Sequence, residues 1–201
     1  MELHLHDAGH LPVPLYPAPL HEGHGRGAGR ELHDLGLESY GDWARLLFEL
    51  LAGRPYRFYE VGEGLAGASK PTSLRALRWL RRRGFALLIS LTVEPPNRAK
   101  VHEAGLEHHH MPIKNHQVPS LELLERIAAL IDEGRSRGLG VVVHCSAGQG
   151  RSGTALAYYL WSRRGYGMQQ AITHVRKACP GAIEPHQEAL LKAWANSQGR
   201  P

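Results

Sequence analysis

The first helical pattern of apolar residues begins at Trp43. Five apolar residues fall on one helix face: Trp43, Leu46, Leu47, Leu50 and Leu51. Gly53 and Pro55 end this pattern. The sequence therefore predicts an amphipathic helix whose apolar stripe docks on the rest of the protein, because a large exposed apolar patch is rarely tolerated. Residues 1–30 are rich in Gly, Pro and His and predict an irregular arm.

Beyond this helix, short apolar runs alternate with amphipathic segments. The predicted strands are residues 56–61, 85–91, 106–111 and 141–143. The predicted helices are residues 71–84, 119–138, 151–164, 168–178 and 185–197. This alternation predicts an α/β fold, with a central mixed, mostly parallel sheet of four to five strands flanked by helices on both faces. We therefore divide the chain into an N-terminal extension, residues 1–54, and a single domain, residues 55–201.

A glycine-rich turn joins the strand at residues 141–143 to the helix that follows it. It reads His144-Cys145-Ser146-Ala147-Gly148-Gln149-Gly150-Arg151-Ser152. A turn that follows a strand and opens a helix directs successive backbone N–H groups into one concavity, which binds an anion together with the helix dipole. The glycines permit the backbone dihedral angles that such a turn needs. The sequence therefore predicts a phosphate-binding loop made by Ser146, Ala147, Gly148, Gln149, Gly150 and Arg151.

Four side chains of this turn indicate the chemistry. The positive potential of the turn is expected to keep Cys145 largely as a thiolate near neutral pH, and a thiolate can accept a phosphoryl group. Arg151 offers two parallel donors to phosphate oxygens, which Lys cannot reproduce. Ser152 can donate a hydrogen bond to the Cys145 sulfur and help it leave in a second step. His144 is interpreted as a buried residue that supports the turn.

This segment resembles the signature of the protein-tyrosine-phosphatase superfamily, His-Cys-five residues-Arg-Ser/Thr, at every defining position. Three further segments resemble the small atypical dual-specificity phosphatases: Leu65-Ala66-Gly67, Ile89-Ser90-Leu91-Thr92 and Pro180-Gly181-Ala182-Ile183-Glu184. The resemblance covers about residues 56–194. It implies the dual-specificity phosphatase fold, a cysteinyl-phosphate intermediate and no metal or cofactor. It also implies a phosphorylated protein or a small phosphate ester as substrate, and inorganic phosphate or sulfate as a ligand of the loop.

One position departs from this family. In the family, an Asp on a separate loop protonates the leaving oxygen, but Asn115 stands at the expected position. An amide cannot donate a proton as an acid. His116 is adjacent and can titrate near neutral pH, and Glu94 is a second candidate acid. Three explanations stay open: a relocated acid, a slow enzyme that favours good leaving groups, or a chain that binds phosphate better than it turns it over.

The predicted function is hydrolysis of phosphate monoesters on phosphotyrosine proteins and on phosphoserine or phosphothreonine proteins. One alternative is a phosphate-binding protein without turnover. Another is a small-molecule phosphatase acting on inositol phosphates or nucleotides. The second alternative ranks lower because highly charged substrates would call for Lys or Arg inside the loop, where Gln149 and Gly150 stand.

Charge and cysteine content narrow the setting. The formal net charge is +5, from 24 Lys and Arg against 19 Asp and Glu. Two interpretations of this charge stay open: it favours anionic partners such as phosphate esters, acidic phosphoproteins or nucleic acid, or the Arg-rich helix faces only keep the protein soluble. Two cysteines give no disulfide framework, and neither a signal peptide nor an apolar run long enough to span a bilayer is visible. We expect a cytoplasmic protein with no membrane partner, and rank nucleic acid low.

The histidines of the arm suggest a metal only weakly. His4, His6, Asp7 and His10 could bind an ion if the arm folded around it, but their Gly- and Pro-rich context fixes no geometry. A solvated tail is the favoured interpretation. The sequence therefore predicts no metal site.

Overall fold

A five-stranded sheet forms the centre of the protein, in a computed structural model that describes residues 40–115 and 117–199. In spatial order its strands are β1 (Phe58–Gly62), β2 (Leu65–Ser69), β5 (Gly140–Cys145), β3 (Phe85–Ser90) and β4 (Glu107–His110). The pairs β2–β5, β5–β3 and β3–β4 are parallel, and β1 is antiparallel to β2. The predicted mixed, mostly parallel sheet is therefore confirmed. The sequence pattern missed one of its strands, β2.

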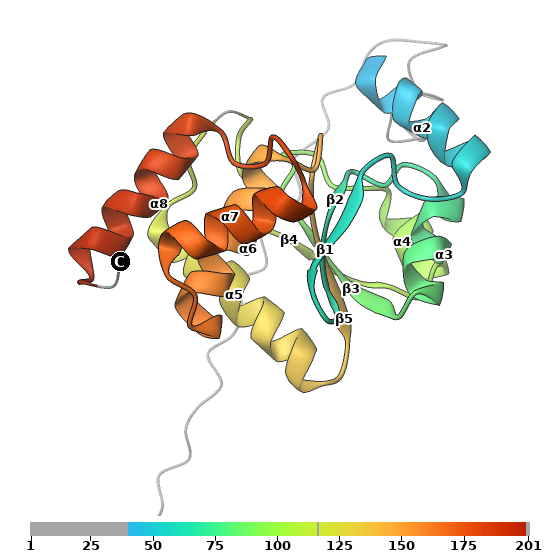
Figure 1. The fold of residues 1–201 in the computed structure, drawn as a ribbon. Coiled ribbons are helices and arrows are strands. Elements are labelled where there is room, and N and C mark those ends of the chain that lie inside the picture. The colour runs from blue at the N-terminus through green and yellow to red at the C-terminus, as the bar shows by residue number, and fades with distance from the viewer. Residues whose placement is uncertain (1–39, 116, 200–201) are drawn as a thin grey trace, which may run out of the picture.

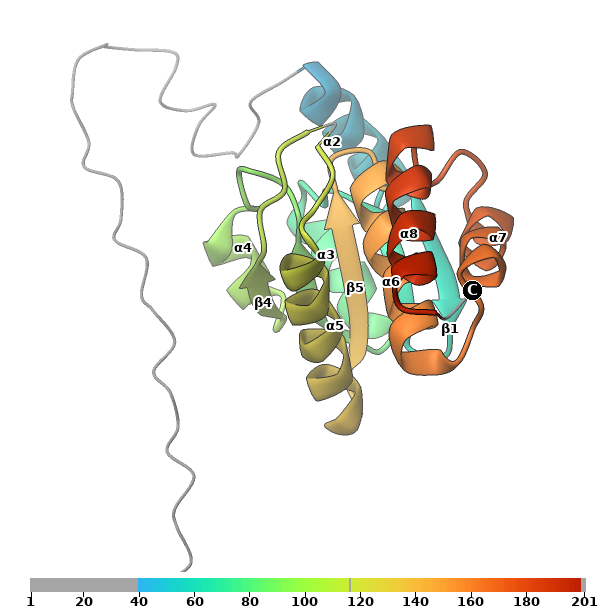
Figure 2. The same ribbon diagram turned by 90° about the vertical axis from the view of Figure 1, so that its left-hand side faces the viewer.

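Helices cover both faces of this sheet (Figures 1 and 2). On one face lie α3 (Leu74–Arg82) and α4 (Arg98–Glu103). On the other face lie α5 (Leu121–Ser136), α6 (Gly150–Arg164) and α7 (Met168–Ala178), and α7 contacts β1 through His174. Helix α8 (Pro185–Ser197) packs outside, against α6 and α7. Helix α2 (Tyr40–Ala52) sits beside α3, away from the α5–α8 layer. The predicted helices are present, whereas the short helix α4 was not predicted.

Strand β5 is buried along its whole length because both of its faces are covered. Successive side chains of a strand point to opposite faces. Val141, Val143 and Cys145 belong to the larger apolar cluster beneath α5 and α6, whereas Val142 belongs to the cluster beneath α3 and α4. The alternation therefore places the side chains of Cys145 and His144 on opposite faces of the sheet.

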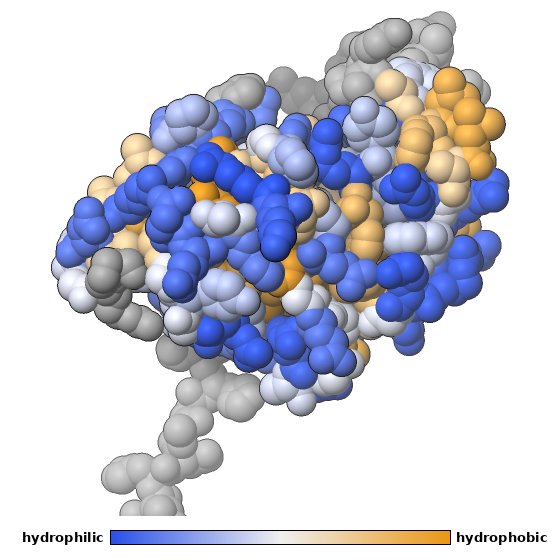
Figure 3. Space-filling model, in the orientation of Figure 1, coloured by the Kyte–Doolittle hydropathy of each residue, from blue (hydrophilic) through white to orange (hydrophobic). Residues whose placement is uncertain are grey.

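Helix α2 docks through a buried carboxylate, and the predicted docking through its apolar stripe is wrong. The Glu49 carboxylate is fully buried and accepts hydrogen bonds from the N–H groups of Thr72 (3.0 Å) and Ser73 (2.7 Å) and from the Thr72 hydroxyl (2.9 Å). Much of the apolar stripe faces outward, as Figure 3 shows at the end of the molecule formed by α2: Trp43, Leu47, Leu50 and Leu51 are 46%, 61%, 50% and 76% exposed. The physical reason is that Glu49 can reach the N–H groups that open α3 only if the helix turns this face toward the domain.

No helix in the described ranges is both long enough and apolar enough to cross a membrane. The irregular arm predicted for residues 1–30 lies outside the described residues.

Candidate active site

The candidate site lies where the four parallel strands end. Parallel strands bring their carboxyl ends, and the loops that follow them, to one edge of the sheet, which is where ligands bind in open α/β folds. The glycine-rich loop after β5 opens α6 at this edge. The loops that follow β3 and β4 reach the same edge and contact the first turn of α6. The topology thus brings the predicted loop and the segment containing Asn115 together.

Cys145 and Ser152 face each other across the loop. Cys145 ends β5 and is 2% exposed, and Ser152 lies fully buried in the first turn of α6. The Cys145 sulfur lies 3.4 Å from the Ser152 hydroxyl oxygen. A hydroxyl at this distance can donate to a thiolate, as the sequence predicts.

Arg151 is held at the mouth of the loop by two backbone carbonyls. Its side chain is buried, and its Nη1 donates to the carbonyls of Ile113 (2.8 Å) and Leu91 (3.3 Å). Within the described parts of the chain, Nε and Nη2 of Arg151 donate to no other group. That edge of the guanidinium is the pair of parallel donors that binds two oxygens of a phosphate. The two carbonyls therefore orient the guanidinium while leaving its phosphate-binding edge available.

The start of α6 has no side-chain cap. Gln149 occupies the cap position without a capping hydrogen bond. Among described residues, none accepts a hydrogen bond from the N–H groups of residues 146–150. Unpaired N–H groups at a helix N-terminus carry a partial positive charge and bind anions.

Gly148 allows the loop to lie directly on β2. Its φ is +74°, in the left-handed region that favours glycine. A Cβ at this position would also lie 2.5 Å from the carbonyl carbon of Ala68 and from the nitrogen of Ser69. Both observations exclude a side chain here, so the course of the loop depends on this glycine.

The start of α8 lies close to the end of the loop at Gly150. A Cβ on Gly150 would lie 2.7 Å from a carboxylate oxygen of Glu184 and 3.1 Å from the amide oxygen of Gln187. The same Gln187 oxygen accepts hydrogen bonds from the Thr154 hydroxyl (3.1 Å) and the Glu184 N–H (3.0 Å). Sequence reasoning used Glu184 only as a mark of resemblance and missed Gln187. The capping box that these two residues form was the available signal.

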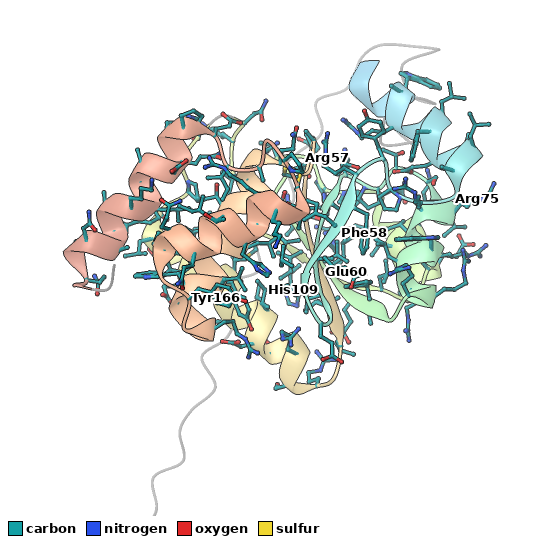
Figure 4. All side chains as sticks on the ribbon, in the orientation of Figure 1. Arg57, Phe58, Glu60, Arg75, His109 and Tyr166 are labelled. Atoms are coloured by element: carbon teal, nitrogen blue, oxygen red, sulfur yellow. The ribbon has the colours of Figure 1, made fainter. Side chains whose placement is uncertain are left out.

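Arg57 is a second contact that the sequence did not reveal. Its guanidinium donates to the Ala147 carbonyl and lies 5.6 Å from the centre of the Tyr56 ring. Arg57 directly precedes β1, at the same edge of the sheet as the loop (Figure 4). It adds a positive charge beside the loop, which favours an anionic ligand.

His144 is fully buried and uncharged. Burial lowers its pKa to about 3, since the charged imidazole cannot be solvated there. Its Nδ1 lies 3.4 Å from the Cys145 carbonyl oxygen, and its Nε2 lies 2.5 Å from the Ser90 hydroxyl oxygen. This placement agrees with a supporting residue rather than a proton carrier.

Asn115 and Glu94, two of the three residues considered for the role of the family's acid, are both exposed. Asn115 is exposed and follows Ile113, which holds Arg151, by two residues. None of the described residues hydrogen-bonds its side chain. His116 lies outside the described residues. Glu94 is exposed, and its backbone carbonyl accepts a hydrogen bond from the Thr92 hydroxyl (2.6 Å).

A second cysteine lies close to the loop. Cys179 is a free, buried cysteine whose sulfur lies 3.9 Å from the Gly148 carbonyl oxygen. Among the residues that the structure describes, no group of three His, Cys, Asp or Glu side chains is placed to hold a metal ion. The arm histidines His4, His6 and His10, with Asp7, lie outside the described residues.

The sheet, its helices and the Cys145–Arg151 loop define a small atypical dual-specificity phosphatase of the protein-tyrosine-phosphatase superfamily. A family model described as "Swiss Army Knife protein, DSP-PTPase phosphatase domain" matches residues 61–191, more than half of the chain. The protein belongs to this family.

Individual relatives are distant and longer. Tyrosine-protein phosphatase cdc-14 of Caenorhabditis elegans is 26% identical over 125 residues, which cover 60% of this chain and 17% of that protein. Dual specificity protein phosphatase 7 of Homo sapiens is 30% identical over 99 residues, covering 49% of this chain and 23% of that protein. The chain thus spans only about a fifth of the length of these curated relatives.

Solved structures of comparable size share the fold. The crystal structure of Tk-PTP in the active form superposes with a TM-score of 0.64 at 28% identity, covering 70% of this chain and 97% of that one. Human DUSP28 superposes with a TM-score of 0.59 at 23% identity, covering 73% of this chain and 99% of that one. The second likeness concerns the fold alone.

Proposed function

We propose that this protein hydrolyses phosphate monoesters through a cysteinyl-phosphate intermediate on Cys145, with aryl phosphates such as phosphotyrosine as preferred substrates. The observation that carries the proposal is the convergence of three features at one strand end. The Cys145 sulfur lies 3.4 Å from Ser152, the helix N-terminus beside it is uncapped, and Arg151 presents a free pair of donors. An anion that satisfies all three places its phosphorus next to the sulfur.

In the first step, the Cys145 thiolate attacks phosphorus. A sulfur–phosphorus bond forms while the bond to the leaving oxygen breaks, and the electron pair of that bond stays on the oxygen. The loop N–H groups and Arg151 bind the non-bridging oxygens and stabilise the charge that spreads over them in the transition state. The leaving oxygen takes a proton from an acid or from water, or departs as a stable anion.

In the second step, water attacks the phosphorus of the cysteinyl phosphate. The sulfur–phosphorus bond breaks, inorganic phosphate forms and the thiolate is regenerated. Ser152 assists this step, because its hydroxyl can donate a hydrogen bond to the departing sulfur at the observed separation of 3.4 Å.

The preference for aryl phosphates follows from the loop after β4. Asn115 stands at the expected position of the acid, and no Asp or Glu occurs in residues 111–119. A phenolate leaves with little protonation, whereas an alkoxide from phosphoserine needs an acid. Phosphotyrosine therefore suits this site better than phosphoserine or phosphothreonine.

The rival proposal is a protein that binds phosphate without turning it over. The same Asn115 favours it, whereas Cys145, Arg151 and Ser152 together favour an enzyme. Small phosphate esters, including inositol phosphates, remain a lower-ranked substrate class because the loop carries Gln149 and Gly150 where a second cation would be expected.

The deciding experiment follows turnover of para-nitrophenyl phosphate and traps the intermediate by acid quenching and mass spectrometry. The proposal expects turnover and a phosphoryl adduct on Cys145. Cys145→Ser should remove both, whereas the matched variant Cys179→Ser should keep the adduct on Cys145. Binding of vanadate without turnover or adduct would instead establish the phosphate-binding alternative.

A further inference from the structure

Three side chains form a hydrogen-bonded chain behind the nucleophile. The Ser90 hydroxyl oxygen lies 2.5 Å from Nε2 of His144 and 2.7 Å from Nε2 of His108. The chain continues on the other side of the His144 ring, where Nδ1 lies 3.4 Å from the Cys145 carbonyl oxygen. Ser90 and His144 are fully buried, and His108 is partly buried. The strand registers account for the assembly: Ser90 pairs with His144 on β5 and with His110 on β4, and His108 precedes His110 by two residues on the same face of the sheet.

The direction of each hydrogen bond follows from the chemistry of the groups. A carbonyl oxygen only accepts, so Nδ1 of His144 must carry the proton for this contact to be a hydrogen bond. The uncharged His144 ring then has a bare Nε2, which accepts the proton of the Ser90 hydroxyl. The Ser90 oxygen in turn accepts from the Nε2–H of His108. Only this arrangement satisfies all three contacts with uncharged rings.

We propose that His108 is a positioning residue for the nucleophile, acting through Ser90 and His144 on the Cys145–Ser146 peptide. The inference rests on the proposed function of the loop. In a planar trans peptide, the carbonyl and the N–H point in opposite directions. A His144 donor that fixes the Cys145 carbonyl therefore fixes the Ser146 N–H on the other side, toward the loop interior. That N–H is the first donor of the phosphate-binding loop and lies next to the thiolate.

Because the hydrogen-bonded residues are buried, the loss of one hydrogen bond among them affects the others. The Ser90 hydroxyl has a single proton, which it donates to His144, while its oxygen accepts a hydrogen bond from His108. Without the His108 donor, a buried hydroxyl oxygen loses its partner and the Ser90 proton has no fixed direction. The His144 tautomer that holds the Cys145 carbonyl is then no longer imposed. His108 itself lines a cavity of about 420 Å³ with Arg98, His102 and His110, so the chain runs from the surface to the loop.

The experiment measures alkylation of Cys145 by iodoacetamide as a function of pH, with and without inorganic phosphate. It uses the full chain, with Cys179 alkylation quantified separately by mass spectrometry. His108→Leu and Ser90→Ala should each shift the alkylation profile to higher pH. At neutral pH, each should slow alkylation about three- to tenfold, the effect of one buried hydrogen bond. Phosphate should protect Cys145 less well in both variants.

Three comparisons separate positioning from packing. The double variant should be no slower than either single variant, because both substitutions break the same chain. His108→Gln should restore the profile, since its amide N–H can donate to Ser90 as the ring does. His109→Leu is the matched control, because His109 lies on the same strand but points to the opposite face of the sheet (Figure 4). It should leave the profile unchanged.

Additive effects of His108→Leu and Ser90→Ala, or an unchanged profile in both, would overturn the proposal. So would a failure of His108→Gln to restore the profile in a variant with unchanged melting temperature. The measurement requires neither turnover nor phosphate binding. If the unaltered protein shows no protection by phosphate, the proposed function fails while the profiles still decide the role of His108.

Discussion

Two helix N-termini at the same edge of the sheet differ in what accepts hydrogen bonds from their N–H groups. We call the N-terminus of α3 the closed terminus and that of α6 the open terminus. Helix α3 follows β2 and helix α6 follows the neighbouring strand β5. At α3, the carboxylate of Glu49 accepts three hydrogen bonds from Thr72 and Ser73 within 3.0 Å, and the Ser73 hydroxyl accepts one from the Ala76 N–H (3.1 Å). At α6, no side chain caps the helix. One site holds an anion from its own chain, whereas the other offers its donors to a ligand.

The difference shows what turns a helix N-terminus into a ligand site. Both termini carry N–H groups that have no carbonyl partner within their own helix, together with a partial positive charge. Glu49 is fully buried, and burial raises its pKa although the hydrogen bonds from Ser73 and Thr72 oppose this rise. A fixed internal anion thus carries a desolvation cost. At α6, no side chain caps the helix, and we propose that a phosphate ligand held by Arg151 and the loop takes the place of a fixed anion.

Removal of the Arg151 clamp should produce the largest effect. In Arg151→Lys, a single ammonium replaces the paired donors, and kcat/KM for para-nitrophenyl phosphate should fall about a hundredfold to a thousandfold. Phosphate protection of Cys145 should weaken in parallel. Steady-state kinetics and alkylation measure both. Retained protection with lost turnover would indicate that the backbone N–H groups of α6 hold the anion without Arg151. The N-termini of α3 and α6 would then bind their anions in the same way.

A carboxylic acid at position 115 should increase turnover at the open terminus of α6. A positioned acid contributes about a hundredfold to ten-thousandfold, most for poor leaving groups. Asn115→Asp should therefore raise turnover of phosphoserine peptides more than tenfold, and change turnover of para-nitrophenyl phosphate much less. The gain should decline at higher pH as the new Asp ionises. Equal rates for good and poor leaving groups before the substitution would show that another acid already acts, and His116→Asn then tests that residue.

The substitution Glu49→Ala removes the carboxylate that caps α3 at the closed terminus. Loss of this carboxylate should leave the Thr72 and Ser73 N–H groups without partners and lower the free energy of unfolding by about 1–3 kcal/mol. Helix α2 should exchange its amide hydrogens faster, as measured by hydrogen exchange with mass spectrometry. Sulfate should restore part of the stability by binding at α3, so the stabilisation by sulfate should be larger in this variant than in the unaltered chain, where only the Cys145 loop is open to it. Ala44→Ser, an exposed change on the same helix, is the control.

Acid should weaken the structure behind the open terminus. Burial lowers the pKa of His144 to about 3 and that of His108 to about 4, from an ordinary value of 6.5. Between the lowered pKa of each histidine in the folded protein and its ordinary pKa of 6.5, the histidine binds a proton in the unfolded chain and not in the folded one. Stability should therefore be complete above pH 6.5 and fall as the pH decreases, by up to about 1.4 kcal/mol per pH unit for His144. Denaturant unfolding at several pH values measures the slope, and His108→Leu should make it shallower.

The central strand and the loop could be predicted from the sequence because their signals are local. A run of three valines marks a strand buried on both faces, and the spacing of Cys145 and Arg151 fixes the loop that follows it. Strand β2 carried no such signal. Its residues are small because the sheet is crowded there, as shown by Gly67, where a Cβ would lie 2.3 Å from the Tyr59 ring. Small residues have a low strand propensity, so the pattern does not reveal them.

Contacts between distant residues account for the remaining differences. The partner of Glu49 lies 23 residues away, so the helical pattern of α2 predicted a stripe and could not predict which face docks. Arg57 and Ala147 are separated by 90 residues, and no local motif links them. The residues proposed to perform chemistry at the loop could be identified from the sequence, whereas the residues that hold the loop in place could not. The latter depend on the finished fold.

The attachment of α2 also has a mechanical consequence. A pull on the N-terminal end of the described chain reaches α2 before any strand. The helix is held by the hydrogen bonds of Glu49 and by the donation of Arg75 to the Leu50 carbonyl (2.8 Å), on the flank formed by α3 (Figure 4). Strand β5, which carries Cys145, is third of five and has a neighbour on each side. Under load, we therefore expect α2 to detach first and the edge strand β1 to follow, while β5, which carries Cys145, should be among the last elements to bear the force.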